Sequence, residues 1–454
     1  MKRLVALIAL LPAMATAAPF TQAETAKVDA LAARILATTG VPSASVTVVR
    51  DGQIAYAHAY GVQRADPRAP ASIDARYQIA SVSKQFTAAA MLLLAQDGKL
   101  SLDDKVGKYL PDLTDADKIS LRQLLSHTSG YRDYWPQDYS FVDMATPVQP
   151  QQILDRWAKA PLDFAPGTKW QYSNTGYVAA GLIIEKVSGQ PLLTFLQNRI
   201  LMPLGMRAID GDLATGAGDA VGFMRYAAGP VRRVTPSVKG WLFAAGELAM
   251  STPDLAKWDI SVIDKSVMRP ASYAEQQREV KLADGSGTDY GLGVDVDKVG
   301  SHRRIHHGGE ATGFLTENRI YPDDRAAVVV AVNADFGDAH SAIADGIEAM
   351  LFADTDATAR ARAVLDQIRA GKLDRSRFTA NGNYYFTATA IGDYRASLVK
   401  LAEPLSFTLD KSSIRGGFTA EYYTITYPTA KLKLVLRAEP DGGKIEQFML
   451  FPTS

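Results

Sequence analysis

The pattern of hydrophobic and polar positions indicates a helix and then a β-hairpin at the start of the chain. Residues 24–39 have apolar positions at helical spacing. Residues 43–61 form two runs rich in β-branched and aromatic residues, joined by Asp51-Gly52. Asp-Gly between two such runs is typical of a tight hairpin turn.

The middle of the chain has a different pattern. A long apolar run follows Ser81 and ends near Asp97-Gly98, which is too long for one strand and predicts a buried helix. Residues 101–205 then read as helices and loops, divided by Pro and Gly. We therefore expect a mostly helical region here.

Strand patterns return late in the chain. Four short β-rich runs, separated by turns, predict an antiparallel meander; they are residues 290–296, 304–308, 313–321 and 326–334. An early hairpin, central helices and a late meander together predict one sheet whose strands come from both ends, with an inserted helical region. The fold class is thus α/β, in the α+β sense, and a cleft between the sheet and the helical region is the expected site.

The last hundred residues have a character of their own. Residues 358–372 are charged and helical, and residues 379–454 are rich in Tyr, Phe, Val and Thr with Gly and Pro turns. We predict a main domain over 19–355 and a small α+β accessory domain over 356–454.

The first 18 residues have the features of a secretory signal. Lys2 and Arg3 precede an apolar stretch at 4–11, and Ala15-Thr16-Ala17 has the small residues of a cleavage site. The apolar stretch is too short to span a membrane, so we expect no transmembrane anchor. The alternative is a hydrophobic N-terminal helix packed on the core.

The composition limits the cellular compartment in which the protein is expected and the classes of partner that it could bind. Lys plus Arg and Asp plus Glu each number 49, so neither a nucleic-acid partner nor an anionic-membrane anchor is expected. The chain has no cysteine, which excludes disulfides and thiolate metal sites. An exported protein without disulfides is best explained by the bacterial periplasm.

The segment "SVSK" at residues 81–84 places Ser81 three residues before Lys84, on one face of a helix. A nearby lysine can lower the cost of deprotonating a serine hydroxyl, which makes the pair a candidate nucleophile and activating partner. Backbone N–H groups at the start of the helix would favour the negative charge that develops there. The spacing alone is weak evidence, because Ser397 and Lys400 share it.

Two further motifs add to this candidate. Tyr172 and Asn174 form the only Tyr-x-Asn in the chain, and they could serve as a proton-transfer group and an amide that binds lysine and substrate. The alternative is a buried tyrosine and a turn asparagine.

The third motif is "HHGGEATGF" at 306–314. His307 would give the substrate a hydrogen bond or a positive charge, and Gly309 would let the substrate approach the strand. The Glu310 N–H would be the second oxyanion donor beside that of Ser81. Adjacent histidines on a strand face opposite sides, so we predict no metal, and no cofactor is expected.

Taken together, five ordered stretches resemble the serine β-lactamase-related family, which includes class C β-lactamases, D,D-carboxypeptidases, D-aminopeptidases and family VIII esterases. The stretches are "SVSKQFTAAAMLLLAQDGKLSLDD", "LRQLLSHTSG", "FAPGTKWQYSNTGY", "AAGELAMSTPDLAKW" and "HHGGEATGF". The resemblance covers about residues 25–350. It implies a β-lactamase/transpeptidase-like fold, with an antiparallel sheet flanked by helices.

The resemblance also implies roles for individual residues. Ser81 would be the acylated nucleophile, Lys84 its activating partner, Tyr172 the general base, and Asn174 a residue that binds substrate and lysine. His307-Gly308-Gly309 stands where lactamases carry Lys-Thr-Gly, although a register of 306–308 is an alternative. Gly308 lacks a hydroxyl, so esters or amides of D-amino acids fit better than β-lactams. In "LLSHTSG", His127 would shape a loop at the site, and Tyr131 and Trp135 would line the cleft.

The leading hypothesis is a periplasmic serine hydrolase that cleaves ester or peptide bonds through an acyl-enzyme on Ser81. One alternative is a penicillin-binding D,D-peptidase or weak β-lactamase that acts on β-lactams or peptidoglycan stem peptides. Another class of function is an inactive cell-wall-binding module. The tail resembles an appendage of some family members and is expected to form an NTF2-like α+β cone.

Overall fold

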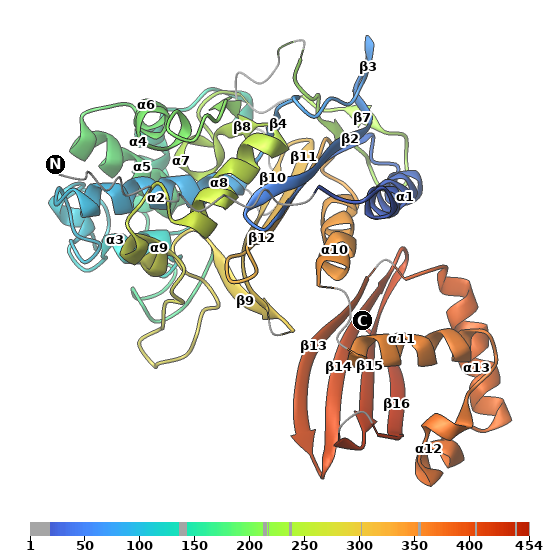
Figure 1. The fold of residues 1–454 in the computed structure, drawn as a ribbon. Coiled ribbons are helices and arrows are strands. Elements are labelled where there is room, and N and C mark those ends of the chain that lie inside the picture. Colours follow the sequence, from blue (N-terminus) through green and yellow to red (C-terminus); the bar gives the residue numbers. More distant parts are fainter. Residues whose placement is uncertain are drawn as a thin grey trace, which may run out of the picture.

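The computed structural model describes residues 19–135, 143–211, 216, 218–235, 238–300, 302–352, 356–404, 406–440 and 443–453. The predicted signal at 1–18 lies outside the described residues. A seven-stranded antiparallel sheet organises the larger part of the chain (Figure 1). Its strands, in spatial order, are β3 (Arg68–Pro70), β2 (Gln53–Ala65), β1 (Ser43–Arg50), β12 (Ala326–Val332), β11 (Phe314–Tyr321), β10 (His302–Ala311) and β9 (Asp295–Val299).

Strands from the two ends of the chain meet in the middle of this sheet. β1 pairs with β12, so that Val46 lies opposite Val330. The β1–β2 turn is Asp51-Gly52, and both residues have positive φ, 54° and 76°, as the hairpin turn requires. The predicted hairpin, the later strands of the meander, β10 to β12, and the single sheet built from both ends are thus confirmed.

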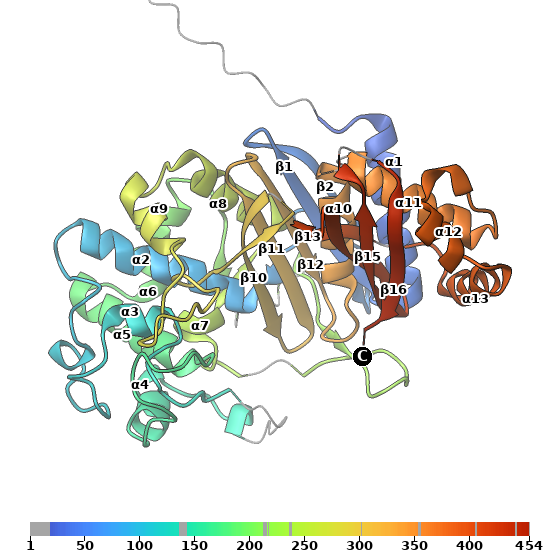
Figure 2. The ribbon, with the colours of Figure 1, turned by 90° about the horizontal axis from the view of Figure 1, so that it is seen from below.

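Helices cover both faces of the sheet (Figure 2). On one face, α1 (Gln22–Thr39) and α10 (Ala339–Leu351) pack through Ile35 and Ile343 onto the valines of β1 and β12. On the other face, α2 (Lys84–Gln96) and α8 (Thr252–Asp264) belong to the larger core that joins the sheet to the helical region. Every residue of α2 from Lys84 to Leu94 is buried, so this helix is enclosed on all sides.

The helical region packs on the face of the sheet that α2 and α8 cover. Its other helices are short, apart from α5: α3 (Leu121–Leu125), α4 (Pro150–Ile153), α5 (Asn174–Ser188), α6 (Leu192–Leu196), α7 (Phe243–Gly246) and α9 (Pro270–Gln276). Small strands connect this region to the sheet: β4 (Tyr77–Gln78), β5 (Ile209–Asp210), β6 (Phe223–Met224), β7 (Arg232–Arg233) and β8 (Leu248–Met250).

One predicted strand is wrong. Residues 290–296 were expected to be extended, but β9 begins only at Asp295. Gly293 has φ of 74°, and a Cβ there would lie 2.6 Å from the Lys84 carbonyl oxygen. The backbone must therefore turn and pass close to α2 at this point, which a regular strand cannot do.

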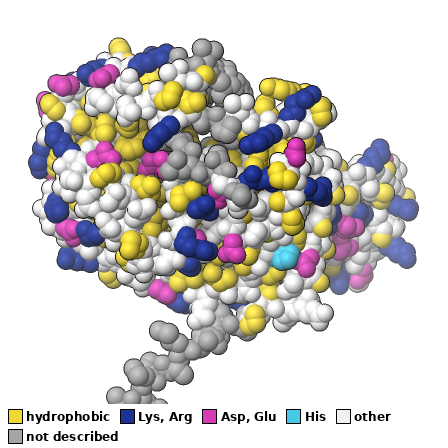
Figure 3. All heavy atoms as spheres, turned by 90° about the horizontal axis from the view of Figure 1, so that it is seen from above, with side chains coloured by type: hydrophobic (Ala, Val, Ile, Leu, Met, Phe, Trp, Pro, Cys, Tyr) yellow, Lys and Arg dark blue, Asp and Glu magenta, His cyan; other side chains and the backbone are white. Residues whose placement is uncertain are grey.

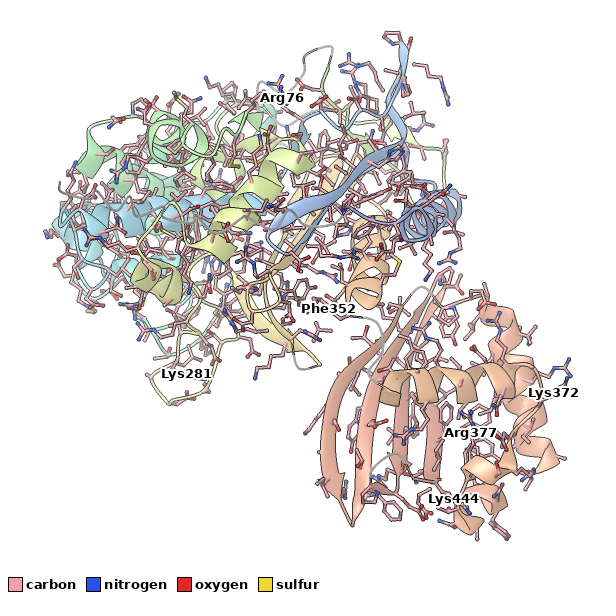
Figure 4. All side chains as sticks on the ribbon, in the orientation of Figure 1. Arg76, Lys281, Phe352, Lys372, Arg377 and Lys444 are labelled. Atoms are coloured by element: carbon pink, nitrogen blue, oxygen red, sulfur yellow. The ribbon has the colours of Figure 1, made fainter. Side chains whose placement is uncertain are left out.

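The end of the chain forms a separate sheet domain, as predicted. Its four strands are β13 (Ser406–Arg415), β14 (Phe418–Tyr427), β15 (Ala430–Ala438) and β16 (Ile445–Pro452), and its helices are α11 (Asp356–Arg369), α12 (Ala380–Tyr385) and α13 (Ala388–Leu398). The core is its own, with Leu365 and Ile368 of α11 packed against Ile425 and Leu434. Phe352, the C-cap residue of α10, is labelled in Figure 4, and its ring stacks on His302 with ring centroids 4.1 Å apart. The boundary at 355/356 and the NTF2-like form stay predictions.

Two further features concern the charges on the surface and the length of the helices. On the face drawn in Figure 3, basic and acidic side chains are interspersed. Within the described ranges, no helix combines the length and apolar character needed to cross a bilayer.

Candidate active site

Ser81 lies in a 3-10 turn, Ala80–Ser83, that leads directly into α2. Ala80, just before it, has φ of 47°, in the left-handed region that residues with a Cβ rarely adopt. The Ile79 N–H donates to Leu248 O (3.0 Å) and Val82 N–H donates to Ile79 O (3.2 Å), so neighbouring backbone holds the turn. The strained turn places Ser81 at the wall of the cleft.

Lys84 lies beneath Ser81 and is fully buried. Its Nζ donates to Ser81 Oγ (3.1 Å), Asn174 Oδ1 (2.7 Å) and the Ala245 carbonyl oxygen (2.7 Å). These three acceptors use the full donor capacity of an ammonium group. The Ser-x-x-Lys pair and the Tyr-x-Asn motif thus converge on one nitrogen, Lys84 Nζ.

Burial lowers the pKa of Lys84 to about 7, because the low-dielectric interior disfavours the charged amine. The negative charge of Asp133 acts in the opposite direction and raises the pKa of Lys84. At neutral pH, a substantial fraction of Lys84 is therefore an uncharged amine that can accept a proton.

Tyr172 lies on the other side of the serine. Ser81 is near enough to lower the pKa of its hydroxyl against the effect of burial, and Lys84 Nζ lies 4.8 Å from the centre of its ring. Burial raises the pKa of Tyr172 well above its usual range, so the phenol keeps its proton at neutral pH. This protonation state suits the proton-donor part of the proton-transfer role, and the general-base role that the resemblance implies stays a prediction.

Asn174 begins α5, which Ser173 caps through its side chain. The Asn174 amide is used at both ends: Oδ1 accepts from Lys84, and Nδ2 donates to the Asp133 carboxylate (3.2 Å to each oxygen). The lysine contact expected of Asn174 is thus present. The prediction also had this amide bind a substrate carbonyl. In the structure, the Asn174 amide nitrogen donates to Asp133 instead.

His307 lies on β10 at the far wall, buried, with both ring nitrogens engaged. Nδ1 is 2.5 Å from Gly308 O, and Nε2 is 3.0 Å from the Tyr290 hydroxyl. The same hydroxyl lies 3.2 Å from His127 Nε2, while His127 Nδ1 accepts from the Ser173 N–H (3.0 Å). The Ser173 N–H at one end and the Gly308 carbonyl at the other fix the direction of these hydrogen bonds. His127 donates to Tyr290, Tyr290 donates to His307, and His307 donates to Gly308 O.

His127 and His307 are both uncharged at neutral pH. Burial, and next the positive charge of Lys84, lower the pKa of His307 to about 3 and that of His127 well below its usual range. The positive charge considered for His307 is therefore not available to a substrate. His127 shapes the loop, as expected, and does so with φ of 60°.

His306 faces the opposite side of β10, where Nε2 lies 3.4 Å from Asp297. The two adjacent histidines thus have different surroundings, and His307 is the one that lines the cleft with Ser81. In the described part of the chain, no group of three or more His, Cys, Asp or Glu is arranged to hold a metal ion.

The cleft between these walls has a volume of about 1010 Å³. Its lining contains six of the seven predicted site residues, namely Ser81, Tyr172, Asn174, His307, Gly309 and Glu310. Lys84, the seventh, lies buried behind Ser81. Trp135 lines the cleft as expected, whereas Tyr131 is in the hydrophobic core and not in the lining.

Three parts of the site were missed from the sequence. Asp133 holds Asn174, Tyr290 joins the two histidines, and the Ala245 carbonyl accepts from Lys84. "AAGEL" could have indicated a backbone acceptor only through its place in the family pattern. No local signal distinguishes Asp133 or Tyr290 from surface residues of a loop.

Known proteins share this arrangement. Residues 28–349 match the family described as Beta-lactamase. Penicillin-binding protein 4* of Bacillus subtilis is 29% identical over 308 residues, which are 64% of this chain and 68% of the relative. D-aminopeptidase of Brucella anthropi is 29% identical over 304 residues, 65% of this chain, but the match spans only 57% of the length of that relative.

Solved structures agree with the sequence comparison. A D-stereospecific amidohydrolase from Streptomyces sp. superposes with a TM-score of 0.62 at 29% identity, over 73% of this chain and 99% of the other. An octameric penicillin-binding protein homologue from Pyrococcus abyssi covers 95% of this chain and 96% of its own, with a TM-score of 0.66. At 22% identity, that second likeness speaks for the fold alone.

The predicted family and its enzyme class, serine hydrolases, are confirmed by these matches. The family match covers the whole sheet from β1 to β12 and the helical region between them, with the Ser81 turn inside it. This chain belongs to the beta-lactamase family.

Proposed function

We propose that the chain is a serine hydrolase that cleaves amide or ester bonds through an acyl-enzyme on Ser81. The observation that carries the proposal is the buried Lys84 Nζ, 3.1 Å from Ser81 Oγ, with a pKa lowered to about 7. An amine poised near neutral pH at hydrogen-bond distance from a serine is suited to act as a general base.

The proton path follows from the protonation states. Uncharged Lys84 takes the Ser81 proton as Oγ attacks the carbonyl carbon and the C=O π electrons move to oxygen. Tyr172, which is protonated, gives its proton to the leaving nitrogen or oxygen as that bond breaks, and regains a proton from the Lys84 ammonium. Water then attacks the acyl-enzyme by the same groups in reverse order.

The negative charge that develops on the substrate carbonyl oxygen requires hydrogen-bond donors next to that oxygen. We assign this role to the backbone N–H groups of Ser81 and Glu310, which both belong to residues of the cleft lining. Gly309 lets β10 pass close to the turn that carries Ser81, because a Cβ there would come within 2.1 Å of the Ile79 carbonyl oxygen.

The substrate class follows from the third motif. His307 is uncharged and Gly308 has no hydroxyl, so neither supplies the fixed charge and hydrogen bond that a β-lactam carboxylate would use. The similarity to D-aminopeptidase and to a D-stereospecific amidohydrolase supports amides of D-amino acids. Efficient β-lactam hydrolysis is not expected.

The test is Ser81→Ala, assayed with a p-nitrophenyl ester and with a D-alanine p-nitroanilide. Turnover should fall at least about a thousandfold, because no covalent intermediate can form. The matched control is Ser397→Ala in the exposed Ser-x-x-Lys pair, which should leave turnover unchanged. Unchanged turnover in Ser81→Ala would overturn the proposal.

The similarity to penicillin-binding protein 4* keeps a second candidate, a slow penicillin-binding D,D-peptidase. Intact-mass analysis after incubation with a fluorescent penicillin, and separately with a fluorophosphonate, distinguishes the two. A lasting penicillin adduct on Ser81 would favour the second candidate, and a fluorophosphonate adduct alone would favour the first. No adduct from either reagent would favour the inactive cell-wall-binding module.

We also propose export to a periplasm, supported by the signal features at residues 1–18 and by the absence of cysteine from the sequence. Expression of the full chain in a Gram-negative host, followed by fractionation and N-terminal sequencing, tests it. A mature N-terminus near residue 19 in the periplasmic fraction is expected, and an uncleaved cytoplasmic protein would contradict it.

A further inference from the structure

Asp133 lies in the loop after α3, at the wall of the cleft that also holds Ser81 and Tyr172. Its carboxylate accepts from the Asn174 backbone N–H (3.0 Å), from Asn174 Nδ2 (3.2 Å) and from the Trp135 N–H (3.2 Å). All three donors are uncharged, and the residue is only partly exposed. The carboxylate is thus held by neutral groups, while burial raises its pKa above the ordinary value.

The orientation of the Asn174 side chain depends on this carboxylate. Its Oδ1 faces the Lys84 ammonium at 2.7 Å, and its Nδ2 faces Asp133. A flipped amide would point its NH₂ at the ammonium and its oxygen at the carboxylate, and both contacts would be repulsive. Asp133 therefore selects the orientation in which Asn174 accepts from Lys84.

The charges of Asp133 and Lys84 also act on each other. The carboxylate raises the pKa of Lys84 against the effect of burial, and Lys84 lowers the pKa of Asp133, whose net pKa burial still raises. A line of contacts thus runs from Ser81 Oγ through Lys84 and Asn174 to Asp133.

We propose that Asp133 is a positioning residue of this site, which holds the Asn174 amide with its oxygen toward Lys84 and supplies the negative charge opposite the ammonium. The proposal rests on the proposed function of Ser81 and Lys84. Asp133 acts through these residues and not on the bond that is cleaved.

A purely structural role is the competing explanation, because Asp133 also accepts the first N–H of α5. Removing the carboxylate would weaken the start of that helix in either case. The pH dependence separates the two roles, since only the electrostatic role changes the proton affinity of Lys84.

The test compares wild-type protein with Asp133→Asn and Asp133→Glu, measuring kcat and KM for one p-nitrophenyl ester from pH 5 to pH 10. Asp133→Asn is nearly isosteric but uncharged, and we expect kcat to fall about tenfold to a hundredfold with little change in KM. The limb of the profile that reports Lys84 should move to lower pH, because the variant lacks the charge that raises the pKa of Lys84. Asp133→Glu keeps the charge, so its limb should stay near that of wild type while kcat falls.

The control is Ser173→Ala, which removes the side-chain cap of α5 at Gly176 N–H (3.3 Å) without changing any charge. It should lower the melting temperature and leave the limb in place. If Asp133→Asn folds and its limb stays where it is in wild type, the proposal is overturned whatever the value of kcat, because a structural role alone would also lower kcat. If Asp133→Asn does not fold, the Asp133→Glu profile decides, because a limb displaced by more than one pH unit in that variant contradicts the charge role.

These outcomes differ from failure of the proposed function. That failure would appear as full turnover in Ser81→Ala, or as no turnover in wild type. The Asp133 comparison is read only from changes relative to an active wild-type enzyme that Ser81→Ala abolishes.

Discussion

Two Ser-x-x-Lys sequences occur in the chain, one at Ser81 and Lys84 and the other at Ser397 and Lys400, and their surroundings differ in almost every respect. Lys84 is fully buried and donates to three acceptors. Lys400 is exposed, and Ser397 donates to the Asp393 carbonyl oxygen (2.8 Å) on the surface of α13. Spacing brings a serine and a lysine together, but burial and neighbouring groups decide whether the pair can react.

The difference lies in the polypeptide around each pair. Segments from four places in the sequence enclose Lys84: the Ser81 turn, the start of α5 with Asn174, the Ala245 backbone and the loop of Asp133. Their combined effect is to remove water from the amine while giving it acceptors, which lowers its pKa without expelling it from the site. An exposed pair on one helix receives no such contributions.

The largest effect is expected for Lys84→Met, which keeps an unbranched side chain of similar length but removes the base. Turnover of the p-nitrophenyl ester should fall by about 10³-fold or more, because general base catalysis and the positioning of Asn174 are both lost. Steady-state kinetics beside a circular dichroism melt checks the result. A folded Lys84→Met protein with more than one tenth of wild-type turnover would break the comparison.

The next test uses pH. The pKa of Lys84 is lowered from its ordinary value to about 7, so the uncharged amine forms as pH rises through 7. If that amine is the base, kcat/KM should increase up to pH 8 and be about tenfold lower at pH 6 than on the plateau. A stopped assay over this range, with buffers of constant ionic strength, measures it. A rate that is flat between pH 6 and pH 8 would assign the base role elsewhere.

A smaller effect is expected from Tyr290→Phe. The hydroxyl joins His127 to His307, so its loss leaves a buried donor and a buried acceptor unpaired. The free energy of unfolding should fall by about 1–3 kcal/mol, with a several-fold drop in kcat as His307 loosens beside Gly308. Urea unfolding and ester kinetics measure the two effects.

Tyr131→Phe is the matched control for this change. Tyr131 is buried in the same domain, and its hydroxyl has no hydrogen-bond partner among the described residues. Removing that oxygen should leave stability the same or raise it slightly. Equal losses in both variants would mean that the histidine–tyrosine chain contributes nothing beyond packing.

The sequence predicts the fold of this protein well because the determinants are local. Asp51-Gly52 predicts a hairpin, an apolar run of sufficient length predicts a helix at α2, and short β-rich runs separated by turns predict the strands in residues 304–334. The one failed strand, at 290–296, depends on a close approach to Lys84 O that only the folded chain contains. Glycines at 291 and 293 were the sole sign of it.

The site was predicted less completely, because proton affinities depend on contacts between distant segments. The sequence places His307 on a strand, but the burial and the positive charge of Lys84 that lower its pKa come from the fold, as does its hydrogen-bond partner Tyr290. The base role given to Tyr172 likewise did not include the burial that raises its pKa. Such effects require knowledge of which groups are enclosed together.

The smallest effect is expected at the exposed pair, in Lys400→Met. Lys400 is exposed in the 3-10 turn Val399–Leu401 that follows α13, so its replacement should change the free energy of unfolding by less than about 0.5 kcal/mol and leave ester turnover unchanged. Measured beside Lys84→Met, the two variants carry the same substitution at the same motif position and differ only in surroundings. A loss of turnover in Lys400→Met would mean that the C-terminal domain contributes to the reaction, and burial would then no longer suffice to explain why one pair is reactive and the other is not.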